Sequence, residues 1–388
     1  HMRRGVSLRF PSALREWHRR LDNDAISMEI QPTAVRWVAR LSCLVEDLDE
    51  AVDLFAHWLE APTLPADEWK RLVKSYRAGA REQWAQPIGV VDALSSVQVF
   101  GFGHPMAHPA HEKSYAQSRY EEACDVARGA PCRESDIIAM VGGDIDQDTG
   151  LELLRRLIDR LPAGTAVRPR EPEPAGARHD IWILDNREID QVYFALGRVG
   201  SRAGDPQRMA LRLADYALGS GGFSSRLMKR VRSEMGHTYS IGSALTMDQV
   251  LGPFQIQSFT QTTNLAAMLE LIFSELEAIA NDGFTADEVD DARRHLHGSL
   301  PLHLTSPEVI LRVTADGLHA GLGLEDLEAD WSSIPDITRD DVNAAARRLL
   351  GDFRLALIGP ADQLRSQVAD RGSIAEFPFG SAPDCWAT

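Results

Sequence analysis

Apolar residues recur at helical spacing in both halves of the chain. Leu48, Val52, Phe55 and Leu59 fall three or four positions apart, so they line one face of a helix. A longer run with the same spacing covers residues 265–279. Both segments are therefore predicted to be amphipathic helices.

Shorter apolar segments predict strands. Residues 137–141, 181–184 and 355–358 are continuous apolar runs of the kind that is buried in a sheet. Residues 191–196 are also strand-like, and residues 254–259 alternate as a half-buried strand does. Strands are thus predicted in both halves of the chain.

Local signals mark where several helices begin and end. A helix is predicted at residues 209–218, and Gly219 is expected to end it. Thr285 and Glu288 have the spacing of a capping box, which predicts the start of another helix.

The two halves of the chain repeat each other at offsets of 216 to 220 residues. This constant offset predicts two homologous domains. Because residues 179–217 have no counterpart in the first half, the first domain is expected to be N-terminally truncated. The matching segments are residues 59–61 with 276–278, 66–68 with 286–288, 125–126 with 341–342, and 142 with 359.

A proline-rich, charged segment without apolar periodicity separates the two halves. It covers residues 166–178 and is interpreted as the linker between the domains. The first domain is then predicted at residues 3–165 and the second at residues 179–388.

Composition narrows the classes of function. The 388 residues carry a formal net charge of −16 with a pI near 5.2, which argues against nucleic acid as a partner because phosphate binding needs a basic face. No apolar run reaches the 18 residues of a membrane span. The four cysteines lack the paired spacing of a zinc site or a disulfide framework. Together with a start that lacks the apolar core of a signal peptide, these features lead us to expect a soluble cytoplasmic protein.

A glycine-rich stretch carries the most specific pattern. Gly219, Gly221 and Gly222 predict a helix stop and a tight turn, and no lysine follows in the register of a phosphate loop, so a nucleotide site is not expected. Further on, Arg232 and Tyr239 lie seven residues apart, a layout that can hold an extended peptide. Taken alone, Arg232 is best explained as a solvated helix residue and Tyr239 as a packed strand residue.

The histidines offer no convincing metal site. His104, His108 and His111, followed by Glu112, form the only tempting group, but two intervening prolines break any shared helical face. We therefore expect this chain to bind no metal and no cofactor.

Several motifs together resemble the pitrilysin-type metallopeptidases, the inverzincin family. They are Gly-Gly-Phe-Ser-Ser-Arg-Leu at residues 221–227, Arg-x-x-x-Gly-x-x-Tyr at 232–239 and Thr-x-x-Glu at 285–288, with Gly-His-Pro at 103–105 in the first half. The resemblance implies an α+β fold of two homologous domains, each a mostly antiparallel sheet with helices on one face.

The family's zinc motif, His-x-x-Glu-His, is absent from this sequence, and Gly79 or a neighbour stands where a further glutamate ligand is expected. In two-subunit bacterial members of the family, one subunit carries the zinc motif and its homologue carries an Arg/Tyr pair that reaches the substrate. The resemblance thus implies a non-catalytic, peptide-binding subunit that is inactive alone, with zinc in a homologous catalytic partner. The residues implied in substrate binding are Arg232, Tyr239, Gly219, Gly221, Gly222 and Phe223.

The peptide substrate is hypothesised to be a precursor or leader peptide of a natural product, because bacteria often use such split pairs there. Two alternatives stay open. The first is a catalytically silent scaffold that holds peptides without a role in cleavage, and the second is a self-sufficient hydrolase with an unrecognised site.

Overall fold

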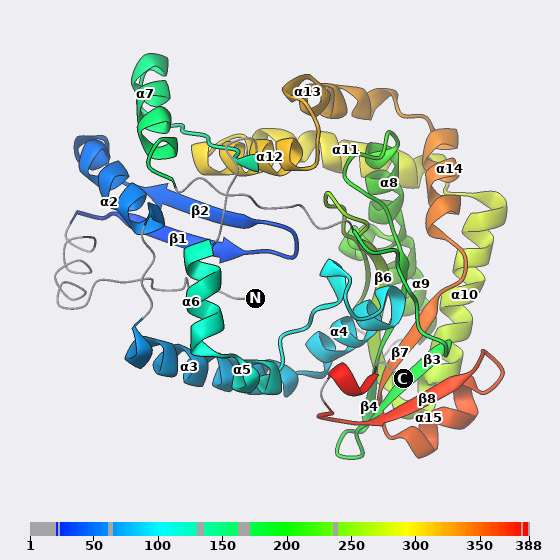
Figure 1. Ribbon diagram of the computed structural model, residues 1–388. Helices are drawn as coiled ribbons and strands as arrows, with labels where there is room; N and C mark the ends of the chain where they lie inside the picture. The colour runs from blue at the N-terminus through cyan, green and yellow to red at the C-terminus, as the bar shows by residue number, and fades with distance from the viewer. Residues whose placement is uncertain are drawn as a thin grey trace. The chain divides into compact units, whose positions relative to one another are not determined.

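Six strands from the second half of the chain form one sheet in the computed structural model (Figure 1). The structure describes residues 21, 24–60, 65–129, 136–161, 171–235, 240–381 and 383–386. Contacts group these residues into two units, which are described separately. Unit 1 comprises the described residues up to Arg81, those of Ala110–Arg170, and Ser306–Ala315, and unit 2 comprises those of Glu82–Pro109, Glu171–Thr305 and Asp316–Thr388.

The sheet of unit 2 has the strand order β5-β6-β4-β7-β3-β8. The pairs β5/β6, β6/β4 and β4/β7 are antiparallel, whereas β3 runs parallel to both β7 and β8. The predicted mostly antiparallel sheet is therefore confirmed. The strands are β3 (Ile181–Asp185), β4 (Gln191–Val199), β5 (Ile241–Leu245), β6 (Pro253–Gln261), β7 (Arg354–Gly359) and β8 (Ile374–Pro378).

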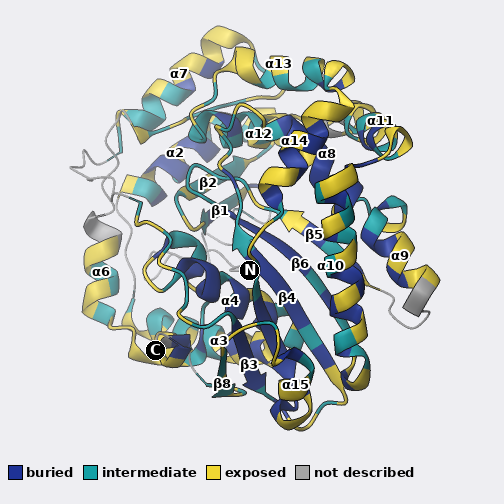
Figure 2. Ribbon diagram, turned by 90° about the vertical axis from the view of Figure 1, so that its right-hand side faces the viewer, coloured by how far each residue is buried: buried dark blue, intermediate teal, exposed yellow. Residues whose placement is uncertain are grey.

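Helices cover one face of this sheet and bury the larger core. Phe194 and Leu196 of β4 pack there with Leu211, Leu269 and other apolar helix residues. Figure 2 shows most of β4 in the dark blue of buried residues. The apolar stripe predicted at residues 265–279 is the buried face of one of these helices, α10. The helices of this layer are α8 (Arg208–Asp215), α9 (Arg226–Met235), α10 (Leu265–Asp282), α11 (Ala286–His303), α14 (Arg339–Leu349) and α15 (Ala361–Val368).

The opposite face of the sheet is covered by α4 (Pro87–Phe100), a helix from the first half of the chain. In Figure 1, α4 and α10 lie on opposite sides of the strands. Leu94 of α4 packs with Trp182 and Ile358, and Gly197 of β4 lets the helix approach, because a Cβ there would lie 3.1 Å from Val99. Burial on both faces explains why β3 and β7 are continuously apolar.

Unit 1 contains an antiparallel hairpin and several helices. The hairpin pairs β1 (Ser27–Pro32) with β2 (Trp37–Ser42). Ile30 of β1 packs with Phe55 and Trp58, which lie on the predicted apolar helix α2. The helices of this unit are α2 (Leu48–Glu60), α3 (Ala66–Trp84, as far as Arg81), α5 (Glu112–Gln117), α6 (Tyr120–Gly129), α7 (Gln147–Ile158) and most of α12 (Pro307–His319).

Short helical segments complete the chain. They are η1 (Val45–Asp47) in unit 1 and, in unit 2, η2 (Pro105–Ala107), η4 (Tyr216–Ser220), η5 (Gly222–Ser224), η6 (Thr262–Asn264), α13 (Leu324–Ser333), η7 (Ile334–Asp336) and η8 (Pro383–Trp386).

The order of elements supports the internal repeat, because β5, β6, α10 and α11 of unit 2 repeat the order of β1, β2, α2 and α3 and begin 214 to 220 residues after them. One prediction from the repeat is wrong. Residues 137–141 form no strand, although β7, their counterpart, is central in its sheet. β7 pairs with β3 and β4, and the described part of unit 1 has no equivalent of either strand. Ile138 is consequently 44% exposed, whereas its counterpart Leu355 is 4% exposed.

The predicted domain boundary at residues 166–178 stays a prediction, and residues 162–170 lie outside the described residues. Contacts place residues 82–109 with unit 2 and residues 306–315 with unit 1. Within the part of the chain that the structure describes, no helix is both long enough and apolar enough to cross a membrane.

Candidate functional site

The glycine-rich stretch begins as a π-helical turn. After α8 the chain continues without a break into η4 (Tyr216–Ser220), so the prediction that Gly219 ends the helix is wrong. Gly219 instead permits close packing, because a Cβ at this position would lie 2.6 Å from the Ser243 Oγ. The glycine therefore lets the turn lie directly against strand β5.

The next two glycines form the predicted tight turn. Gly221 lies against Tyr216, where an added Cβ would be 2.7 Å from the Tyr216 carbonyl oxygen. Gly222 has a φ of 58°, in the left-handed region that glycine adopts readily. The turn continues as η5 and ends at α9, and it carries Phe223 at its outer side.

A buried carboxylate anchors this turn to the sheet. The Ser243 hydroxyl donates to the Asp215 Oδ1 at 2.5 Å and lies 3.2 Å from the Asp215 carbonyl oxygen. Ser220 and the Leu245 N–H also hydrogen-bond to this carboxyl. Burial nevertheless raises the pKa of Asp215. The π-helical turn and the edge strand β5 are thus joined through Asp215.

Phe223 and Arg232 form an exposed pair at the outer side of the turn. The Phe223 ring is 73% exposed, and the Arg232 Cζ lies 4.8 Å from its centroid, within cation–π range. Arg232 is itself exposed on α9 and makes no ion pair with another described residue. The ring therefore supports one face of the guanidinium while its N–H groups stay available to a ligand.

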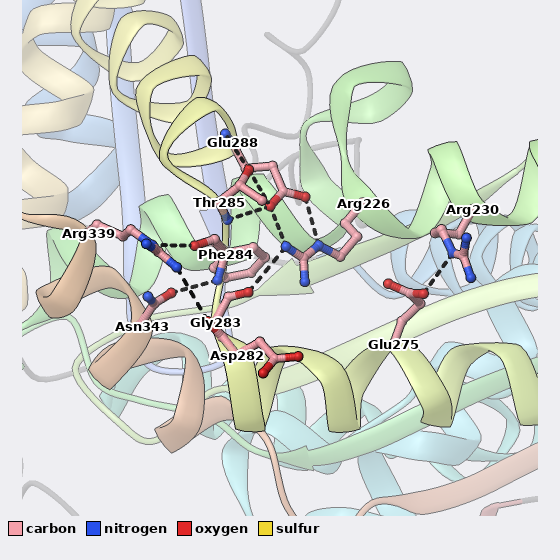
Figure 3. A network of polar contacts seen from close by, with 10 residues as sticks. All are labelled: Arg226, Arg230, Glu275, Asp282, Gly283, Phe284, Thr285, Glu288, Arg339 and Asn343. Carbon is pink, nitrogen blue, oxygen red and sulfur yellow. Dashed lines mark hydrogen bonds and ion pairs between the residues drawn. The ribbon is translucent and has the colours of Figure 1, made fainter.

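Arg226, at the start of α9, holds the helix in place through a largely buried ion pair (Figure 3). Its Nε donates to the Glu288 Oε1 at 2.7 Å, and the two side chains are 13% and 14% exposed. Arg226 also contacts the Gly283 carbonyl at 3.3 Å and lies over the Phe284 ring. This network connects the glycine-rich turn to the loop between α10 and α11.

Glu288 is shared between this ion pair and a helix cap. The Thr285 N–H and hydroxyl donate to the Glu288 Oε2 at 2.8 and 3.0 Å, so the predicted capping box is present. Burial alone would raise the pKa of Glu288, but the hydrogen bonds from Arg226 and Thr285 outweigh it and lower the pKa. Glu288 is therefore held as a carboxylate.

Two further contacts fix the surroundings of the ion pair (Figure 3). Arg339 and Asn343 of α14 bind the backbone of Phe284 at 2.6 and 2.8 Å. Arg230 of α9 donates to Glu275 of α10 at 2.7 Å. Helix α9 is thus tied directly to α10 and α11, and through the loop between these two helices to α14.

Arg226 was not predicted as a site residue. The signal was present, because Arg226 belongs to one motif and Glu288 ends another, and the two carry opposite charges. Nothing in either motif shows that they meet in space. Tyr239, the predicted partner of Arg232, lies outside the described residues, so its position stays a prediction.

The histidines considered as metal ligands have local roles. His104 and His111 accept the backbone N–H groups of Met106 and Lys113 through Nδ1, at 3.2 and 3.1 Å, and so cap short helices. His104 also stacks on Phe100, and burial lowers its pKa.

Glu112 is bound by Arg77 and Arg81, whose hydrogen bonds lower its pKa to about 2. Among the described residues, no three histidine, cysteine or acidic side chains are grouped as metal ligands. The described side chains therefore do not fit a zinc site.

The segment that carries this geometry matches a known family. Residues 133–296 match the model described as the peptidase M16 inactive domain. Over this segment, which is less than half of the 388 residues, the chain is similar to the M16 peptidases. The resemblance inferred from the motifs is thereby confirmed.

Proteins with a sequence similar to this chain include some named as proteases and one named as a non-peptidase. The chain is 28% identical over 244 residues to an uncharacterized zinc protease of Streptomyces coelicolor, covering 60% of this chain but only 52% of the relative. It is 24% identical over 346 residues to the non-peptidase homolog YmxG of Helicobacter pylori, covering 87% and 78% of the two chains.

The fold of this chain matches that of a solved structure. The crystal structure of a peptidase M16 inactive domain from Pseudomonas fluorescens superposes with a TM-score of 0.78 at 24% identity. The match covers 93% of this chain and 84% of that one. The predicted α+β class is therefore confirmed.

Proposed function

We propose that this chain is the non-catalytic, peptide-binding subunit of a heterodimeric zinc peptidase. A homologous partner with the His-x-x-Glu-His motif would hold the zinc and perform the cleavage, and this chain would bind the peptide beside it. The residues assigned to the peptide are Arg232, Tyr239, Gly219, Gly221, Gly222 and Phe223.

The exposed Phe223–Arg232 pair carries this proposal. The guanidinium of Arg232 is exposed, is stacked on an exposed ring and has no ion-pair partner among the described residues, so it has no evident role in stability. The arrangement suits a ligand, because a guanidinium donates two parallel hydrogen bonds to a carboxylate or binds a peptide carbonyl. The Arg226–Glu288 pair supports this role by fixing α9.

Tyr239 has a separate task in the proposal. A phenol hydroxyl can donate to the oxyanion that develops when an amide is hydrolysed. Because that charge develops in the transition state, loss of Tyr239 would lower the turnover number more than it weakens peptide binding.

The test is reconstitution with a homologous chain that carries His-x-x-Glu-His and is encoded beside this gene. Cleavage of a precursor peptide encoded near this gene is measured with each chain alone and with both chains together. We expect cleavage only by the pair. Arg232→Gln should raise KM, and Tyr239→Phe should lower kcat by about 10²-fold, whereas Lys74→Gln, a change of an exposed lysine on α3, should alter neither.

Cleavage by this chain alone would overturn the proposal in favour of a self-sufficient hydrolase. Unchanged turnover in both the Arg232 and Tyr239 variants would instead indicate a silent scaffold.

A further inference from the structure

Helix α9 carries a concentration of positive charge on an otherwise acidic chain. Its ten residues include Arg226, Lys229, Arg230 and Arg232, whereas the whole chain has a net charge of −16. Two of these cations are neutralised locally, since Arg226 pairs with Glu288 and Arg230 with Glu275. The other two cations, Lys229 and Arg232, have no such acidic partner among the described residues.

Lys229 and Arg232 share one exposed face of the helix. They are three residues apart, which places their side chains next to each other on a helix surface. Both are exposed, and neither forms an ion pair with another described residue. Phe223, which stacks on Arg232, adds an exposed aromatic ring to the same face. We call Phe223, Lys229 and Arg232 the cationic strip.

Among the described residues, no acidic side chain of the neighbouring elements forms an ion pair with Lys229 or Arg232 of the strip. The glycine-rich turn, residues 216–224, and strand β5 contain no acidic residue. On α10, Glu275 is occupied by Arg230 and Glu270 by Arg371. Two like charges held side by side without a counter-ion repel each other, so an arriving anion relieves that repulsion.

We propose that the cationic strip binds a carboxylate of the peptide and makes this subunit select peptides that present a carboxylate to the strip. The inference rests on the proposed peptide-binding function and names its substrate class. Arg232 would bind the carboxylate through its guanidinium and Lys229 would add a second charge, while the Phe223 ring contacts an adjacent apolar group. The carboxylate belongs either to an aspartate or glutamate side chain or to the C-terminus of the peptide.

The test measures binding of three fluorescent decapeptides to the full chain by anisotropy. Their shared neutral sequence contains a central Glu-Phe with an amidated C-terminus, a central Gln-Phe with a free C-terminus, or a central Gln-Phe with an amidated C-terminus. We expect at least one carboxylate peptide to bind about tenfold or more tightly than the uncharged one, as for hydrogen bonds to charged groups. The peptide that gains identifies the source of the carboxylate.

Variants assign the preference to the strip. Arg232→Gln should abolish the discrimination and Lys229→Gln should reduce it, whereas Lys74→Gln on α3 should preserve it. Raising the salt concentration to 1 M should also reduce it, because the charges are exposed.

Two outcomes would contradict the proposal, and only the second would also contradict the proposed peptide-binding function. Equal binding of all three peptides, weakened equally by Arg232→Gln, would disprove acid selection and leave peptide binding intact. Absence of binding for every peptide, with and without the zinc-bearing partner, would overturn both.

Discussion

Glu288→Gln is expected to destabilise unit 2 strongly, although it changes one oxygen to an NH₂ group. The glutamine can still cap α11, because glutamine serves at this position of a capping box. What it loses is the charge that balances Arg226, whose side chain is only 13% exposed. The substitution therefore isolates the ion pair from the cap.

The size of the effect follows from the burial of the pair. Breaking a buried ion pair by removing one partner costs about 3–5 kcal/mol, because the other charge stays buried without compensation. We expect about 3 kcal/mol, the lower end, since Arg226 keeps its contact with the Gly283 carbonyl. For a unit of this size the melting temperature should fall by roughly 6–12 °C.

The effect should also depend on pH. The folded-state pKa of Glu288 is lowered, so its stabilising contribution is present above the ordinary value of 4.5 and is lost as the pH falls through the lowered value. The difference in melting temperature between the wild type and Glu288→Gln should therefore be constant near neutral pH and narrow in acid.

Thermal unfolding by circular dichroism measures both quantities. The matched control is Glu275→Gln. It removes the charge that pairs with Arg230, which lies on α9 like Arg226. Because Arg230 is 46% exposed, that change should cost no more than about 1 kcal/mol. Equal melting temperatures for the two variants would refute the argument that burial of the Arg226 pair stabilises the unit.

Three further predictions concern unit 2. Gly219→Ala should lower the free energy of unfolding by about 1–3 kcal/mol, because the added Cβ would meet β5. Gly298→Ala, at a position on α11 where the added Cβ meets no other atom, should raise the free energy of unfolding by about 1 kcal/mol. Urea titration of both variants measures these changes. Burial raises the folded-state pKa of Asp215, so its ionisation costs stability as the pH rises; between pH 4 and pH 7 the melting temperature of the wild type should therefore fall relative to that of Asp215→Asn. Leu94→Ala on α4 should lower the free energy of unfolding measured in urea by about 2–5 kcal/mol, against about 0.5 kcal/mol or less for Leu324→Ala, an exposed position in the same unit.

Signals confined to one element predicted the structure well. The alternating and continuous apolar runs became β3, β4, β6 and β7, and the amphipathic stripes became α2 and α10. The capping box at Thr285 formed as expected. In each case the pattern is set by a single buried face or a single terminus, so the sequence contains the whole cause.

Signals that depend on distant partners failed. Residues 137–141 have the composition of a strand, but a strand also needs neighbours to accept its hydrogen bonds. Gly219 was interpreted as a helix stop because its packing against Ser243 is invisible in the local sequence. The placement of α4 on the sheet of unit 2 was missed for the same reason.

The candidate site shows the same division. The sequence supplied Arg232, Phe223 and the glycines through their motif, and the structure brings the first two together. It did not supply the Arg226–Glu288 pair, which joins two motifs.

The place of β7 in the sheet has a consequence for synthesis. β7 lies between β4 and β3, yet it is made last of the three, at residues 354–359. Until then the nascent chain cannot unite β3 with β4, and α4, finished more than 250 residues earlier, has no complete surface on which to bury Leu94. Such distant pairings fold slowly and leave apolar surface exposed to aggregation. Production of this protein should therefore benefit from slow translation and from chaperones that shield α4.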